Sequence, residues 1–289
     1  MPMAVVAVPR ARTTWVAPAL VAGLTVSLYA SAIAQMVREW AASPNASHGF
    51  LVVPIALYLA WLKRGRVASL PRIASPWGIP AIGVAVLMFL AGRWAEINFV
   101  SALSLVVLLG GYGLCFLGAA IMRELAFPYA FLIFMVPWPD LLVEFVSFPM
   151  QLISATYAAM FMGLLGVPVT RSGVDIALPH VTFTVAAPCS GMNSLVALLA
   201  LAALLAYLSR GPLWKRIVLF ASGAPLALIA NVLRIVCILL IGTLWGQKAA
   251  EGFFHGFSGM ALFLAALLGL LAVARTLGLR SGPAEKRHA

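Results

Sequence analysis

Residues 216–245 read RIVLFASGAPLALIANVLRIVCILLIGTLW, and this stretch decides the class of fold. After Arg216, the sole charged residue in it is Arg234. About 20 apolar residues are enough for a helix to cross the hydrocarbon core of a bilayer. The stretch therefore predicts a membrane-spanning helix, and the arginine inside it needs an explanation of its own.

The composition of the whole chain extends this prediction. Of its 289 residues, 63% are hydrophobic and only 9% are charged, and the mean hydropathy is +1.05. Soluble domains carry roughly 25% charged residues, and disordered chains are poor in aliphatic and aromatic residues, so both classes are excluded. The net charge of +11 does not indicate a nucleic-acid partner, because the basic residues are dispersed among apolar runs. We expect an all-α polytopic membrane protein.

Apolar runs recur along the chain and predict about eight transmembrane helices. They lie at about 14–36, 46–62, 76–92, 96–118, 121–137, 190–209, 216–245 and 256–275. The first run ends in Ala32-Ile33-Ala34, so a cleaved signal peptide is an alternative, but its apolar part is longer than such peptides usually carry. We expect a transmembrane domain over 14–275, between a cytoplasmic N-terminus (1–13) and a basic cytoplasmic tail (276–289).

Basic residues orient these helices, because cytoplasmic loops are enriched in Lys and Arg. With the N-terminus inside, fourteen basic residues fall in inner loops, and the outer loops hold only Arg38, Arg93, Arg171 and Lys248. Arg234 alone stays inside a span. The charge asymmetry therefore predicts that both termini are cytoplasmic.

One long connection, residues 138–188, falls on the outer face between spans five and six. Its polar residues Glu144, Ser147, Gln151 and Ser154 recur at spacings of three and four. Residues 140–165 are therefore expected to form an amphipathic helix that lies in the outer interface or packs against the bundle, although the segment is long enough to span. Apolar residues then alternate from 174 to 185, which predicts a short β-hairpin leading into Cys189.

Arg234 is the first candidate site residue. It lies 18 residues beyond Arg216, or about 27 Å along a helix, which places it near the outer boundary of the membrane. An arginine inside a span is a functional hypothesis by default. The alternative is a side chain that extends to the outer headgroups.

Cys189 stands at the outer start of the span 190–209. A cysteine at a helix N-terminus has its thiolate stabilised by unpaired N–H groups, which makes it a competent nucleophile. Ser190 and Gly191 fit a tight entry into the helix. The alternative is a small buried hydrophobic residue, which is the role we expect for Cys115 and Cys237.

Two histidines stand at outer entrances of spans. His255 begins the last span and His48 begins the second. Histidine transfers protons near neutral pH, although each could instead be a hydrogen-bonded structural residue. The orientation was set without Cys189, Arg234 or His255, yet all three fall on the outer face. Together they supply a nucleophile, a proton shuttle and a cationic group for an oxyanion.

The motifs around these residues are similar to those of the exosortase/archaeosortase family, whose members are proposed to be membrane cysteine peptidases or transpeptidases. The matching stretches are 187–194 (APCSGMNS), 231–235 (NVLRI), His255-Gly256 and the early 47–54 (SHGFLVVP). The resemblance covers about 45–275, in order. Pro188 departs from the small residue expected before the cysteine, which concerns the loop geometry.

The resemblance implies that Cys189 is the nucleophile and that Arg234 and His255 complete a triad. Ser190, Gly191, Asn231 and His48 are expected to support the site or bind substrate. Family members occur in the inner membrane of Gram-negative bacteria that make extracellular polysaccharide, with the site facing the periplasm. Their substrates end in a short Pro-Glu-Pro-like motif, one transmembrane helix and a basic cluster. No cofactor, metal or nucleic acid is implied.

Three other functions compete with this one. Residues 256–259 (GFSG) match a rhomboid serine-protease string, but only His288, in the tail, follows Ser258. A transporter could use Arg234 as an anion site, but no inverted repeat is apparent and the polar groups gather at one face. A non-enzymatic subunit of a polysaccharide export machine could use the same residues for packing.

Overall fold

The computed structural model describes residues 16–43, 46–179, 181–185, 191–251 and 253–281, and most of them are helical. The helices of the first half are α1 (Val16–Ala42), α2 (Gly49–Leu62), α3 (Arg64–Ser69), α4 (Gly78–Trp94), α5 (Asn98–Tyr112), the π-helix η1 (Gly113–Leu117), α6 (Ala119–Glu124), α7 (Ala126–Phe131) and the 3₁₀ helix η2 (Leu132–Met135). Those of the second half are α8 (Asp140–Leu164), α9 (Met192–Leu208), α10 (Leu213–Ala221), α11 (Gly223–Trp245), α12 (Gln247–Glu251) and α13 (Phe253–Thr276).

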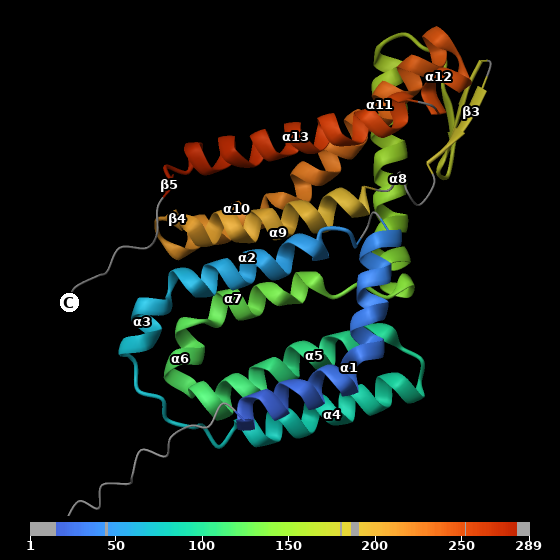
Figure 1. Cartoon of the computed structure of the whole chain (residues 1–289). Coiled ribbons are helices and arrows are strands. Elements are labelled where there is room, and N and C mark those ends of the chain that lie inside the picture. Colours follow the sequence, from blue (N-terminus) through green and yellow to red (C-terminus); the bar gives the residue numbers. More distant parts are fainter. Residues whose placement is uncertain (1–15, 44–45, 180, 186–190, 252, 282–289) are drawn as a thin grey trace, which may run out of the picture.

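The longer helices lie lengthwise beside one another in a bundle with two distinct ends. Figure 1 shows α3, α6 and the short strands β4 (Ser209–Arg210) and β5 (Arg280–Ser281) at one end, which we call the basic end. The opposite end, which we call the site end, carries α8, α12 and the strands β1 (Thr170–Ser172), β2 (Asp175–Leu178) and β3 (Val181–Thr184). Among the described residues, the basic end holds those that the charge pattern assigns to inner loops.

The apolar helices agree with a helical membrane protein. The stretches Asn98–Leu117, Asp140–Leu164 and Leu213–Trp245 are long and apolar enough to cross a membrane. Shorter apolar helices are Gly49–Leu62, Gly78–Trp94, Ala126–Met135, Ser194–Leu208 and Met260–Thr276. The count of eight crossings stays a prediction, because several of these helices are shorter than a span.

Two apolar runs that the sequence presented as continuous are broken into pieces. The run 121–137 forms α6, α7 and η2, and the run 216–245 is divided between α10 and α11. A proline ring clashes with the carbonyl four residues before it. Pro128 lies four residues after the last residue of α6, and Pro225 four residues after the last residue of α10. Proline therefore accounts for both breaks, which hydropathy does not reveal.

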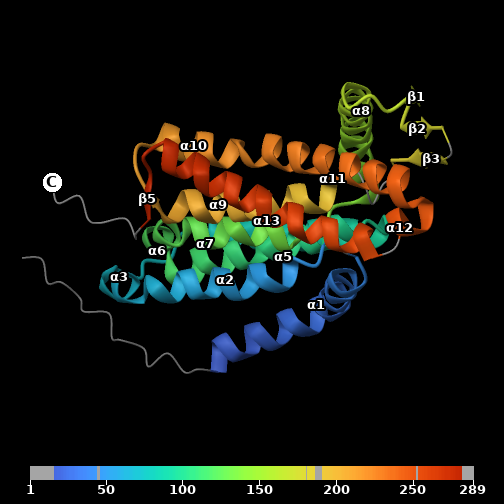
Figure 2. The ribbon, with the colours of Figure 1, turned by 90° about the horizontal axis from the view of Figure 1, so that it is seen from above.

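Helix α8 runs across the bundle. Figure 1 shows it crossing the direction of the long helices, and Figure 2 shows it nearly along its own axis while α9, α11 and α13 lie lengthwise. If the bundle crosses the bilayer, α8 lies along the membrane at the site end. Its direction therefore favours the interfacial position expected for 140–165 over a further crossing.

The predicted hairpin forms and gains a third strand. The order is β1-β2-β3, antiparallel throughout, with Ile176 opposite Phe183. Its inward side chains Ile176, Leu178 and Val185 join a buried cluster with residues of α8 and α11. The sheet thus packs against α8 and α11, and it is the element that precedes Cys189 in the sequence.

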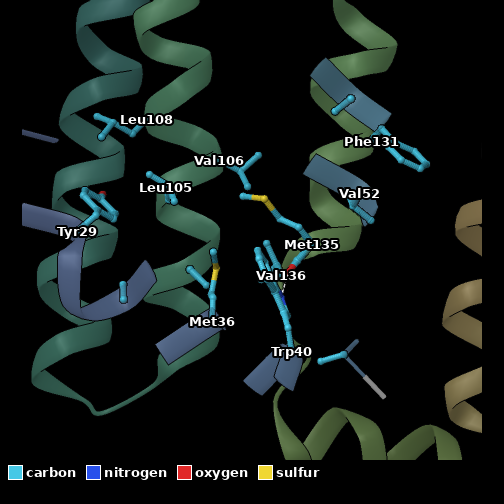
Figure 3. Close-up of a cluster of buried hydrophobic side chains, with 14 of the residues drawn as sticks. Tyr29, Met36, Trp40, Val52, Leu105, Val106, Leu108, Phe131, Met135 and Val136 are labelled. Atoms are coloured by element: carbon cyan, nitrogen blue, oxygen red, sulfur yellow. Dashed lines mark hydrogen bonds between the residues drawn. The ribbon is translucent and has the colours of Figure 1, made fainter. Parts of the chain in front are cut away.

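A second apolar core joins the helices of the first half. Figure 3 shows Met36 and Trp40 of α1 near Leu105 of α5 and Met135 of η2. The indole Nε1 of Trp40 donates a hydrogen bond of 2.9 Å to the carbonyl oxygen of Met135. This core fixes the C-terminal turns of α1 against η2, and so shapes the site end.

Candidate functional site

The structure places some of the predicted site residues and leaves others undescribed. Cys189 and Ser190 lie outside the described residues. His255 is in the first turn of α13, but its side chain is likewise outside the description. Gly191, Asn231, Arg234 and His48 can be examined directly.

Gly191 marks the point where the chain enters α9. It is the N-cap of that helix and has a left-handed backbone, with φ of +83°. A methyl group on its Cα would come within 2.8 Å of the side-chain carbon Cγ of Asn231. Glycine is therefore required here twice, because other residues disfavour this conformation and because no side chain fits against Asn231.

Asn231 joins three helices at this point. Its side chain is buried, and its amide Nδ2 donates a hydrogen bond of 3.0 Å to the hydroxyl oxygen Oγ of Ser154. Asn231 belongs to α11 and Ser154 to α8, while Gly191 begins α9. Two motifs that are 40 residues apart in the sequence, one around Gly191 and one around Asn231, therefore meet in the fold.

Arg234 follows Asn231 by three residues and is the middle residue of α11. It is partly buried. The next turns of α11, with Ile235, Val236 and Leu239, pack against α8 and the sheet. Arg234 therefore stands just before the part of α11 that the sheet covers, which suits a residue near the outer boundary. Guanidinium is a planar cation with five N–H donors, so Arg234 can donate to more than one oxygen.

His48 lines a cavity of about 480 Å³ at the site end. Its Nε2 is hydrogen-bonded to the carbonyl oxygen of Phe134 at 2.9 Å, so the ring is held by the backbone that leads out of η2. Met192 and Val196, in the first turns of α9, form part of the same cavity wall. The cavity volume is in the range of small-ligand pockets.

Acidic residues surround this cavity. Glu39 near the end of α1, Glu96 between α4 and α5, and Asp140 at the start of α8 line it, and none of the described lining residues is a Lys or an Arg. Burial raises the pKa of the Glu39 carboxyl; a hydrogen bond with Gln35 opposes the rise, and the negative charge of Asp140 adds to it. An acidic wall favours cationic occupants over anionic ones.

The start of α9 thus has the Asn231 side chain on one side and the acidic cavity on the other. Asn231 of α11 packs closely against Gly191, while Met192 and His48 both line the acidic cavity. Helix α13, which carries His255, packs against α11. The structure thus brings Gly191 and Asn231 together at the start of α9, beside the cavity that His48 lines.

The structure also reveals residues that sequence reasoning missed. In the sequence, Ser154 is only one member of a polar stripe, and no motif marks the three carboxylates around the cavity. Only 9% of the residues are charged, so an acidic residue outside the inner loops is as unusual as Arg234 and is a candidate site residue for the same reason. Cys237 corrects one expectation, since it is exposed rather than buried, and Cys115 is only partly buried. Helix packing, which decides which face of α11 is covered, is not visible in the sequence.

Fold and site together describe a helical membrane protein in which the motifs of Gly191 and Asn231 meet at the start of α9, beside the cavity that His48 lines. The family model described as transmembrane exosortase matches residues 40–272. The chain therefore belongs to the transmembrane exosortase family, which includes membrane cysteine transpeptidases and is related to protein sorting. No curated protein and no solved structure matches the chain. The family resemblance found in the sequence motifs is confirmed.

Proposed function

We propose that this exosortase is a thiol protease or transpeptidase that cleaves the C-terminal sorting signal of exported proteins. The observation that carries the proposal is the contact between Gly191 and Asn231, because it joins the cysteine motif to the arginine motif. Cys189 is two residues before Gly191, and Arg234 is three residues after Asn231.

In the proposed reaction the Cys189 thiolate attacks the carbonyl carbon of the scissile peptide bond. Arg234 stabilises the negative charge that develops on the carbonyl oxygen, or holds the thiolate before attack. His255 then protonates the nitrogen of the leaving peptide as the C–N bond breaks, which yields a thioester on Cys189. Water or an amine acceptor attacks the thioester, releases the product and returns the thiol.

The substrate is proposed to be a membrane-anchored protein that ends in a short motif, one transmembrane helix and a basic cluster. Its helix would lie in the bilayer beside the enzyme, so that the motif reaches the outer face. The basic end of the bundle supports the proposed orientation, since its cations suit the cytoplasmic side. The site is then periplasmic in a bacterial inner membrane, and residues 14–275 form the functional domain.

A transporter or a non-enzymatic export subunit for extracellular polysaccharide is the alternative. A transporter site is expected near the bilayer midplane. Gly191 and Asn231 lie instead at the start of α9, and the cavity lined by His48 adjoins the same helix start. This arrangement favours chemistry at the membrane surface over passage through it.

The test is to replace the proposed nucleophile in the full-length protein. Cys189→Ala should abolish release of the C-terminal peptide from a membrane-anchored substrate, measured by immunoblot, while leaving membrane insertion intact. Cys237→Ala is the matched control and should retain cleavage, because the Cys237 side chain is exposed and has no part in the proposed reaction. Unchanged cleavage by Cys189→Ala would reject the thiol mechanism.

A second experiment tests the orientation. A membrane-impermeant thiol reagent should label Cys189 in intact spheroplasts of a variant in which Cys115 and Cys237 are replaced by alanine. Labelling that requires permeabilisation would contradict a periplasmic site.

A further inference from the structure

A buried polar contact between α8 and α11 has no role in the proposed reaction. Ser154 has no exposed surface, and its hydroxyl oxygen accepts the 3.0 Å hydrogen bond from the Asn231 amide. A buried amide donor left without its acceptor is strongly disfavoured, so this bond fixes how the Asn231 side chain is turned. Ser154 therefore determines the orientation of a residue that touches the start of α9.

The orientation of Asn231 matters because of what its other atoms face. A methyl group on Gly191 would lie 2.8 Å from Cγ, 2.9 Å from Cβ and 3.1 Å from the carboxamide oxygen Oδ1 of Asn231. The Nδ2 atom of the carboxamide thus faces Ser154, while its Cγ and Oδ1 atoms lie against Gly191. Rotation of the carboxamide would push on the backbone of Gly191 or leave a gap beside it.

We propose that Ser154 is a positioning residue that acts through Asn231 on the segment carrying the nucleophile. Gly191 is the second residue after Cys189, and two peptide units span at most about 7 Å, so displacement of Gly191 is transmitted to Cys189 over a short path. A misplacement of about 1 Å lowers a reaction rate by about 10²-fold. This inference rests on the proposed function, in which Cys189 attacks the substrate.

The surroundings of Ser154 make it a firm support. Ala155, Ala158 and Met162, in the following turns of α8, are buried against Ile235 and Leu239 of α11 and against the sheet. Packing therefore fixes α8 relative to α11 at the level of Ser154. The hydrogen bond converts this fixed packing into a fixed direction for the Asn231 carboxamide.

Helix α8 also provides a matched control. Ser147 is buried on the same helix, and its hydroxyl accepts a 3.0 Å hydrogen bond from Gln151 Nε2, which keeps that contact within α8. Ser147→Ala removes the same hydroxyl from a buried site without touching Asn231. A difference between the two alanine variants therefore measures the link to Asn231 and not the loss of a buried hydroxyl.

The first measurement needs no substrate. Cys189 is the remaining thiol in a Cys115→Ala/Cys237→Ala background, and its alkylation by iodoacetamide is followed against pH in detergent. Ser154→Ala should slow alkylation at neutral pH by about 3- to 10-fold or move the midpoint of the profile, because thiolate formation depends on position at the helix start. Ser147→Ala should stay within about 2-fold of the parent. Equal profiles for the two variants would overturn the proposal.

The second measurement is a double-mutant cycle on cleavage. Ser154→Ala should lower kcat by about 10-fold or more with KM within about 2-fold, and should add little when Asn231 is already alanine. Additive losses would overturn the proposal, since they mean that Ser154 acts independently of Asn231. Ser154→Thr keeps the hydroxyl and should recover part of kcat, whereas general destabilisation would lower it further. Cleavage that persists in Cys189→Ala would instead reject the proposed function, while the alkylation profiles still decide the role of Ser154.

Discussion

The two ends of the bundle use charge in different ways. At the basic end, Lys63 and Arg66 contact Glu124 at 2.9 and 3.0 Å, and Lys215 and Arg216 donate to the carbonyl oxygens of Leu277 and Ala206. At the site end, three carboxylates border a cavity and Arg234 stands partly buried within α11. Charge at the basic end secures helix ends, whereas the three carboxylates at the site end face a cavity in which a ligand fits.

The largest effect is expected from a pair of left-handed glycines, one at each end. Gly191→Ala forces a side chain onto Asn231, whereas at Gly278, with φ of +66°, the nearest atom to an added methyl is Lys215 Nζ at 3.9 Å. Each loses about 1–2 kcal/mol to the backbone conformation. Gly191→Ala should also lower cleavage by about 10²-fold, because the start of α9 moves. Thermal unfolding measures the loss of stability and a cleavage assay measures the loss of activity. Equal losses of activity in Gly191→Ala and Gly278→Ala would contradict a special role for the start of α9.

Next comes exchange of one cation for another. Arg234→Lys should lower kcat by about 10²- to 10³-fold, as expected when a group that stabilises an oxyanion is removed. Lysine lacks the planar, bidentate geometry of guanidinium. Arg216→Lys should stay within about 2-fold, since a lysine also supplies a cation to the carbonyl oxygens at the end of α9. Full activity of Arg234→Lys in a peptide-release assay would instead favour an Arg234 side chain that extends to the lipid headgroups.

Loss of the Glu124 carboxylate should affect stability without affecting chemistry. Glu124→Gln removes two ion pairs that are partly exposed, so a loss of about 1 kcal/mol, or about 2–4 °C in Tm, is expected with kcat unchanged. Burial lowers the pKa of Lys63, but hydrogen bonds with Tyr207 and Glu124 raise it more, for a net rise above 10.5. The stability that the charged Lys63 contributes is therefore fully present below pH 10.5, and it is lost as the pH rises through the folded-state pKa of Lys63. The pair between Arg66 and Glu124 is retained at high pH, so a Tm difference that does not shrink above the folded-state pKa of Lys63 would contradict the contribution of Lys63.

The smallest effect is expected at the cavity. Because the folded-state pKa of Glu39 is raised above 4.5, its ionisation weakens the folded state as pH rises through 4.5 and the folded-state value. Glu39→Gln should therefore raise Tm by about 1 °C at pH 7 and leave it unchanged near pH 4. An equal change at both pH values would show that the carboxyl is not destabilised by its surroundings.

The sequence predicted the class of fold, the charge asymmetry and the β-hairpin, because hydropathy, charge and alternation are local patterns. It also predicted that the motifs of Gly191 and Asn231 belong to one site. It did not predict the breaks before Pro128 and Pro225, because both runs remain apolar across them. It gave no role to Ser154 either, since the stripe on α8 is compatible with headgroups as well as with Asn231. That choice depends on how α8 packs across the bundle, which arises only in the folded chain.

The contact between Gly191 and Asn231 has a consequence for biosynthesis. Gly191 leaves the ribosome 40 residues before Asn231, and translation adds about 5–20 residues per second. For several seconds the cysteine motif therefore exists without the helix that supports it. The sheet that precedes the motif waits even longer, because its apolar side packs against Ile235 and Leu239. The nascent chain is thus expected to acquire its activity only after α11 has been inserted and α13, which carries His255, has been synthesised.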